Sequence, residues 1–313
     1  MRIKQSGYIS SQQCLSFLPY EHKYRKSLYS YMFLEDFSRG FSYEFTPIVM
    51  RDQFYCITPD DDALKRFLQL YGRHSDFNYK FDQLLSEIVH NMLINGRTYI
   101  EIVSFMDQQN AIQGIDFVCI PAKCPLVRRD KYRFTALDRN NKKIFFDVEK
   151  KRVVTFDLKD IGFQRNCFRR LANHLSMFDV TNASALMFNP KMKGLFDFEE
   201  YQKSIEFKLL KTTRPMHWLG RNYSNQHLSE SYHLYRTIQY KTLRYKFLQY
   251  ILCQINGGLN NFKNEWGFTG SVSVSVSLPD YRDIFSRYNS GEINASTLCD
   301  IVVENLMPTE MES

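Results

Sequence analysis

The 313-residue sequence lacks any long apolar run, and this absence argues against a membrane-spanning helix. About 18 consecutive apolar residues are needed to cross a bilayer, and no window of the sequence supplies them. The N-terminus begins with charge but has neither the apolar stretch nor the small-residue cleavage site of a signal peptide. We therefore expect no export through a signal sequence.

Cysteine is scarce and irregularly spaced, with 7 residues scattered along the chain. An oxidised framework would use an even and dense set, so the odd number predicts reduced thiols in a cytosol. Tryptophan is also scarce, with 2 residues, but 26 phenylalanines and 20 tyrosines compensate for it. Because each ring removes a large apolar area from water, we expect a core rich in aromatic side chains.

The motifs of several enzyme classes are absent as well. The sequence has no glycine-rich phosphate loop, no G-x-S-x-G elbow and no H-E-x-x-H pair. Two pairs have metal-like spacing, Cys119 with Cys124 and His227 with His233, but neither completes a set of ligands. We interpret both pairs as structural and expect no metal and no cofactor.

Acidic clusters offer the remaining route to catalysis. Asp60, Asp61 and Asp62 form one cluster, and Glu199 and Glu200 form another. Either could pair for acid–base chemistry or hold Mg²⁺, but both lie at predicted helix starts, where capping and the helix dipole explain them. The sequence therefore favours a protein that is not an enzyme over one whose catalytic groups come from distant residues.

Hydrophobic periodicity predicts an α+β fold. Apolar residues between 81 and 92 recur at spacings of three and four, which indicates a helix, and Gly96 is placed to end it. A strand at 98–105, a polar turn and a second strand at 112–120 follow. Further strands are expected at 132–137, 143–148, 152–158 and 271–277. Further helices are expected at 63–71, 164–177, 198–211, 229–255, 280–289 and 294–306.

The change from strands to helices divides the chain into four predicted segments. An aromatic-rich N-terminal segment covers 1–60, and its secondary structure is not predicted. An α+β portion covers 61–160, a helical, stem-like portion covers 161–260, and a strand with C-terminal helices covers 261–313. The longest predicted helix would end at Gly257-Gly258, and Asn294 would cap the last one.

The charge balance of +7 points to a polyanion as a partner. Basic residues cluster at 128–133, 142–143 and 150–152, and they recur on the predicted helices. The candidates for contact with DNA in a channel are Arg165, Arg169, Arg236, Lys241, Arg244 and Lys246. Such residues also face water on turns and helix surfaces, so both interpretations stay open.

The segment from residue 84 to residue 105 resembles the portal proteins of tailed bacteriophages. In that family a helix ends at a glycine and continues into a strand with a tyrosine, apolar, glutamate, apolar pattern, here Tyr99-Ile100-Glu101-Ile102. The following turn, the strand at 112–117 and Pro121 fit the same order. The strand near 151–158, the helices within 198–255, and the late strand with its helix start at 290–294 occupy the corresponding later places. The similarity covers residues 60–310, in a chain that is short for a portal and would be a reduced member.

This resemblance implies a portal-like fold, with a mixed α/β wing and clip portion and a long helical stem. It implies a homo-oligomeric, dodecameric ring at one vertex of a phage head, through which double-stranded DNA is packaged and later ejected. The implied partners are further copies of the chain, the terminase large subunit, capsid and scaffold proteins, head-tail adaptor proteins and DNA. The implied location is the virion, after assembly in the host cytoplasm. The alternative is a cytosolic nucleic-acid-binding protein that is not part of a capsid.

Overall fold

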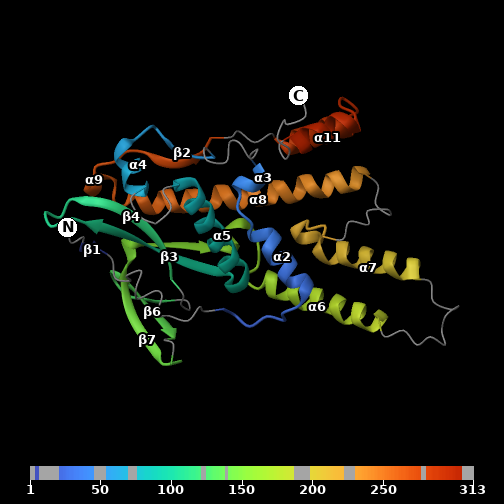
Figure 1. Ribbon diagram of the computed structural model, residues 1–313, viewed down its shortest axis with the longest axis horizontal. Helices are drawn as coiled ribbons and strands as arrows, with labels where there is room; N and C mark the ends of the chain where they lie inside the picture. The colour runs from blue at the N-terminus through green and yellow to red at the C-terminus, as the bar shows by residue number, and fades with distance from the viewer. Residues whose placement is uncertain are drawn as a thin grey trace.

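The computed structural model describes residues 4–6, 21–45, 54–69, 76–120, 125–137, 140–186, 198–221, 230–275 and 280–304. These residues form three small antiparallel sheets surrounded by helices (Figure 1), so the predicted α+β class is confirmed. The strands are β1 (Lys4–Ser6), β2 (Tyr55–Thr58), β3 (Arg97–Met106), β4 (Ile112–Cys119), β5 (Leu126–Val127), β6 (Lys131–Leu137), β7 (Lys143–Glu149), β8 (Val153–Asp157) and β9 (Ser271–Val274).

The helices alternate with the strands early in the chain and dominate its second half. They are α2 (Leu28–Ser38), α3 (Ser42–Phe45), α4 (Asp62–Gln69), α5 (Phe77–Asn95), α6 (Cys167–Leu186), α7 (Phe198–Thr213), α8 (Glu230–Asn260), α9 (Lys263–Trp266), α10 (Tyr281–Asn289) and α11 (Ala295–Glu304). Short 3₁₀ turns follow β7, β8 and α7. Within the part of the chain that the structure describes, no helix is long and apolar enough to cross a membrane.

The unit from α5 to β4 forms as its sequence predicts. Asp76 caps α5, since its Oδ1 accepts from the Asn78 amide at 2.9 Å. Gly96 ends the helix at a φ of 76°, and its amide donates to the Met92 carbonyl at 2.7 Å. A Cβ at this position would also lie 2.3 Å from the carbonyl oxygen of Arg165. Both its left-handed conformation and this close approach require glycine.

Strand β3 is the centre of the first sheet. It pairs with β4 along one edge, and with β8 and β1 along different stretches of the other edge. Side chains on both of its faces are buried, with Ile100 and Ile102 in the main core and Tyr99 in a second core. The second core lies against the sheet of β5, β6 and β7, whose inner face carries Phe134 and Phe146. The sheet of β5, β6 and β7 therefore packs on one face of β3, and the main core lies on the other face.

Helix α8 runs along the molecule beside the first sheet (Figure 1). It begins at Glu230, close to the predicted start, but continues to Asn260 instead of ending at Gly257-Gly258. The predicted end is wrong because Gly258 serves tertiary packing. A Cβ on Gly258 would lie 2.4 Å from Cγ2 of Val154 and 3.0 Å from Cδ1 of Ile102, so only glycine lets the helix approach the sheet this closely.

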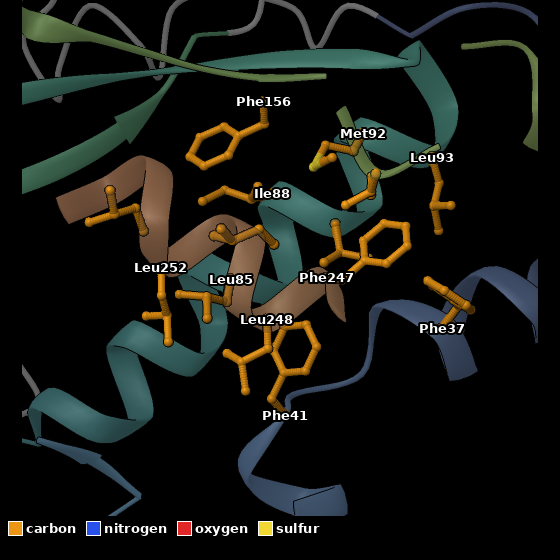
Figure 2. Packing of buried hydrophobic residues seen from close by; sticks show 14 of the residues in the cluster. Phe37, Phe41, Leu85, Ile88, Met92, Leu93, Phe156, Phe247, Leu248 and Leu252 are labelled. Carbon is orange, nitrogen blue, oxygen red and sulfur yellow. The ribbon is translucent and has the colours of Figure 1, made fainter. Parts of the chain in front are cut away.

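One main hydrophobic core draws side chains from all four segments of the sequence. Figure 2 shows Phe247 and Leu248 of α8 next to Leu85 and Ile88 of α5, with Phe37 of α2 nearby. The aromatic N-terminal segment, whose structure was not predicted, thus contributes α2 and α3 to this core. The four segments share one interior, as expected for elements that cannot bury their apolar faces alone.

The C-terminal elements β9, α10 and α11 all contact α8. Strand β9 pairs with β2. The predicted alternation appears in Val272, which is buried, and in Ser273, whose hydroxyl contacts Cys56 and Thr58 on the neighbouring strand. The end of the predicted strand, at 276–277, lies outside the described residues. Helices α10 and α11 form a small core with Leu234 and Ile238 of α8. Asn294 caps α11 as predicted, since its Oδ1 accepts from the Thr297 amide at 2.8 Å.

Candidate functional site

Three of the six candidates for DNA contact are buried inside the chain. Arg236 is 1% exposed, Lys241 is 2% exposed and Arg244 is 1% exposed. Such side chains present no surface to a duplex that passes outside the subunit, so for these three residues a channel-lining role is wrong. Lys241 and Arg244 are buried because they lie on the same side of α8 as the apolar residues that follow them, whereas Arg236 lies on another side and is buried against Thr213 and Trp218.

Arg244 closes the C-terminal end of helix α2. Its Nη1 donates to the carbonyls of Asp36 at 2.8 Å and Phe37 at 3.0 Å, and its Nη2 donates to Arg39 at 2.6 Å. Its Nε lies 2.5 Å from Oε2 of Glu44. The last carbonyls of a helix have no partner within the helix, so Arg244 replaces the water that would otherwise bind them. The guanidinium therefore joins α2, α3 and α8.

Arg236, which precedes Arg244 on α8, also binds a backbone carbonyl of another segment. Its Nη2 donates to the Trp218 carbonyl at 2.9 Å and to the Thr213 hydroxyl at 3.2 Å, next to the end of α7. Thr213 in turn donates to the same Trp218 carbonyl at 2.6 Å. The buried arginines thus fix the segment after α7 and the end of α2 to one helix.

The other three candidates lie nearer the surface. Lys246 is exposed and donates to the Ile161 carbonyl at 3.1 Å. Arg165 forms an ion pair with Asp157, which also binds Arg97. Arg169 is half-buried on α6. A role in DNA contact stays a prediction for these three residues.

A cavity of about 570 Å³ lies where the buried arginine and lysine of α8 meet the N-terminal helices. It draws its walls from the end of α2, from α3, from α8 and from the segment after α7. Its lining consists of Asp36, Arg39, Glu44, His217, Trp218, Leu219, Gly220, Arg221, Thr237, Tyr240, Lys241 and Arg244. Charged groups from parts of the chain that are about 200 positions apart are therefore brought to one place.

Burial changes the proton affinities of the cavity's charged groups. It raises the pKa of Glu44 from its ordinary value, against the opposing effect of Arg244. It lowers the pKa of Lys241 to about 8, although the nearby Glu44 acts in the other direction. It also lowers the pKa of His217, with help from Arg236 and Arg214, so this imidazole is neutral at pH 7. Burial thus disfavours the charged forms of Glu44, Lys241 and His217.

The lowered pKa of Lys241 predicts a pH dependence of stability. Between about pH 8 and its ordinary pKa of 10.5, the unfolded chain keeps a proton that the folded chain has lost. Stability therefore rises with pH in this window. We expect wild type to gain about 1–3 kcal/mol relative to Lys241→Met across it. Urea unfolding of both proteins measures this, and the comparison removes the contribution of tyrosine ionisation. Parallel pH profiles would contradict the prediction.

The acidic cluster at 60–62 has the structural task that its position predicts. Oδ1 of Asp61 accepts from the amides of Ala63 at 2.9 Å and Leu64 at 3.0 Å, which caps α4. Its Oδ2 accepts from the amides of Thr269 at 2.5 Å and Gly270 at 2.9 Å. These hydrogen bonds hold the pKa of Asp61 well below its usual range. Both oxygens are engaged, so this carboxylate ties α4 to the segment before β9.

Each of the two metal-like pairs has one member outside the described residues. Cys119 lies in β4 and His233 lies in α8, whereas Cys124 and His227 lie outside the residues that the structure describes. Among the described residues, no group of three or more histidine, cysteine or acidic side chains is placed to hold a metal ion. Glu199 and Glu200 lie at the start of α7, as predicted. Their side chains are not among those that the structure describes.

Sequence reasoning did not find the cavity, although one signal of it was present. Apolar residues of α8 recur at 234, 238, 248, 251 and 255, at the spacings of a buried helix face. Lys241 and Arg244 fill the two places that this pattern leaves open. Polar residues at core positions predict buried charge, and buried charge needs partners such as Glu44.

No protein-family model matches the chain, and no curated protein matches it.

Proposed function

We propose that the chain is a portal-type structural subunit whose copies close into a ring around double-stranded DNA at a phage head vertex. The order of elements supports this proposal. Helix α5, Gly96, strands β3, β4 and β8, helices α7 and α8, strand β9 and helix α11 follow one another in the order that the resemblance implies. In this function the ring would dock the terminase large subunit, contact capsid and scaffold proteins, and later bind head-tail adaptor proteins.

The observation that carries the proposal is the presence of two separate sets of exposed apolar side chains. The hairpin patch consists of Leu126, Val127, Leu137 and Phe145 on the sheet of β5 to β7. The helix patch consists of Met177 on α6, Phe207 on α7 and Tyr232 on α8. Figure 1 draws β6 and β7 at the lower left and α7 at the right, so the patches belong to different ends of the subunit.

Two unlike apolar patches favour head-to-tail contacts between copies. A contact that joins different surfaces of identical subunits generates a ring when its rotation closes, whereas a two-fold dimer would use one patch twice. Phe145, which is 61% exposed, and Phe207, which is 70% exposed, are the largest side chains that such a contact would cover. We therefore assign the hairpin patch of one copy to the helix patch of the next.

The exposed basic residues suit a passage for DNA. They lie on the turns of the hairpin sheet, at Arg128, Arg129, Lys131, Lys142 and Lys143. Contacts of lysine and arginine with phosphates position a duplex without reading its bases, and this allows the duplex to slide. These residues replace the buried positions of α8 as the preferred DNA contacts.

The same basic turns favour one second candidate function, a nucleic-acid-binding protein that acts outside a capsid. Such a protein would bind DNA as a monomer or dimer, with an affinity that falls steeply as salt rises. The two functions differ in assembly, so the oligomeric state of the purified chain separates them.

Light scattering after size exclusion, together with negative-stain images, tests the ring. We expect ring-shaped particles with a central hole at micromolar concentration. Phe145→Asp and Phe207→Asp each place a charge in one of the two patches, and each is expected to shift the protein to monomers. Leu28→Asp is the matched control, because Leu28 is 65% exposed but belongs to neither patch. A stable monomer in several salt concentrations would overturn the proposal.

A further inference from the structure

A second cavity lies between helices α6 and α7, which run side by side in Figure 1. Its volume is about 480 Å³, within the range of about 300–1,000 Å³ that small-molecule sites occupy. The walls come from the first half of α6, from the end of α7 with its 3₁₀ turn, and from the segment that follows β8 and its turn. We call this space the α6–α7 cavity, and its apolar side consists of Phe163, Cys167, Leu171, Pro215 and Met216.

The apolar side of the α6–α7 cavity is continuous with the main core. Leu171 and Met216 are buried members of that core, and Phe163 and Cys167 pack against it. Burial raises the pKa of the Cys167 thiol to about 11, so the thiol is neutral at pH 7 and behaves as apolar surface. An apolar molecule bound here would therefore leave water and contact the protein interior.

Three basic side chains line the same cavity, Arg170 and His174 from α6 and Lys211 from α7. Arg170 follows Cys167 by three positions, and His174 follows Leu171 by three positions. Residues at this spacing lie on one face of a helix, so α6 presents apolar and basic groups together. Among the described residues of the lining, none is acidic.

The charge of Arg170 and Lys211 is available to a ligand. Neither residue forms an ion pair with another described residue, and the Nη1 atom of Arg170 donates to the neutral Gln164 side chain at 2.9 Å. Asp160, two residues before Gly162, lies outside the lining and accepts from the Tyr250 hydroxyl at 2.7 Å. Both basic side chains are exposed, so they can turn to a bound anion without first breaking an internal ion pair.

We propose that the α6–α7 cavity binds a small amphipathic carboxylate, with its apolar body against Leu171 and Met216 and its carboxylate at Arg170 and Lys211. Burial of the apolar body supplies affinity in proportion to the area that leaves water. The planar arginine fork and the lysine ammonium donate to the carboxylate, and these charge-assisted hydrogen bonds orient the molecule. The described lining comes from one copy of the chain, so the site does not depend on ring closure.

Isothermal titration calorimetry of the full chain with octanoate tests the site, at pH 7.5 and constant ionic strength. We expect saturable binding, with an affinity that rises about fourfold for each buried methylene in the series butanoate, hexanoate, octanoate. Acetate has the head group without the apolar body, and it should give no saturable binding. Octanol has the body without the charge, and it should bind at least about tenfold more weakly than octanoate.

Arg170→Gln and Lys211→Gln are each expected to weaken octanoate binding by about five- to tenfold and to leave octanol binding unchanged. Lys208→Gln is the matched control, because Lys208 is another exposed lysine of α7 but lies outside the lining. It should bind octanoate like wild type. All three positions are exposed, so the variants are expected to fold.

Three results would overturn the proposal. They are the absence of saturable octanoate binding, octanol binding as tight as that of octanoate, and equal octanoate binding by wild type and both cavity variants. Titration of Phe207→Asp separates this site from the ring. Phe207 lies outside the lining, so this variant should bind octanoate like wild type whether or not the protein forms rings.

Discussion

Gly258→Ala is expected to destabilise the protein by about 1–3 kcal/mol. The new methyl group would lie 2.4 Å from Cγ2 of Val154 and 3.0 Å from Cδ1 of Ile102, so α8 and the first sheet would have to move apart. Val154 is on β8 and Ile102 is on β3, and both belong to the main core. Because interiors are close-packed, this separation would loosen contacts along the helix.

Gly257→Ala is the matched control for this substitution. A Cβ at position 257 would have no neighbour within 4 Å, and the residue lies within α8. Alanine is favoured over glycine in a helix, so we expect a gain of about 0.5–1 kcal/mol. Urea unfolding of the two variants and wild type measures both effects. Equal effects of the two substitutions would contradict the close packing at Gly258.

Arg244→Met is expected to destabilise the protein by about 3–5 kcal/mol. The substitution removes four polar contacts at once, three with carbonyls at the end of α2 and one with Glu44. It also leaves the Glu44 carboxylate buried without its main partner. Loss of a buried partner costs more than the pair contributes, because the remaining charge stays out of water.

Glu44→Gln provides the comparison for Arg244→Met. Combining the two substitutions removes the stranded carboxylate, so the double variant is expected to lose less than the two single losses combined. Thermal unfolding followed by circular dichroism measures all four proteins. Strict additivity would show that Arg244 and Glu44 do not act as a pair. Lys246→Met, at an exposed position of the same helix, should change stability by less than about 0.5 kcal/mol.

Much of the α+β half could be predicted because its signals are local. The cap at Asn294, the glycine stop at Gly96 and the alternation of β6 and β7 depend on residues that are close in the sequence. Such features stabilise the same backbone whatever surrounds them. The predicted strand and helix positions from α5 to β8 were therefore close to those in the structure.

The end of α8 could not be predicted in the same way. A glycine pair usually stops a helix, but here Gly258 packs closely against Val154, which lies 104 positions earlier in the sequence. The sequence does not state which residues will face each other at that distance. Packing against the sheet overrides the local preference of glycine.

The DNA-contact residues on α8 were misassigned for a related reason. Basic side chains on a long helix usually face water or a ligand, and only these two interpretations were considered for positions 241 and 244, although both positions lie on an apolar stripe. The partners that make their burial possible, Glu44 and the carbonyls at the end of α2, come from the one segment whose structure the sequence left unassigned. Without those partners, the cavity could not be foreseen.

The contact between Arg244 and the end of α2 has a consequence for how the chain is made. The carbonyl of Asp36 and the guanidinium of Arg244 are 208 positions apart, so a ribosome releases α2 long before the arginine that binds its last carbonyls. Until then α2 packs only on elements that are made earlier, such as α5 and α6, and water binds the carbonyls at its C-terminal end. We therefore expect the end of α2 to reach its final packing only after α8 has been synthesised.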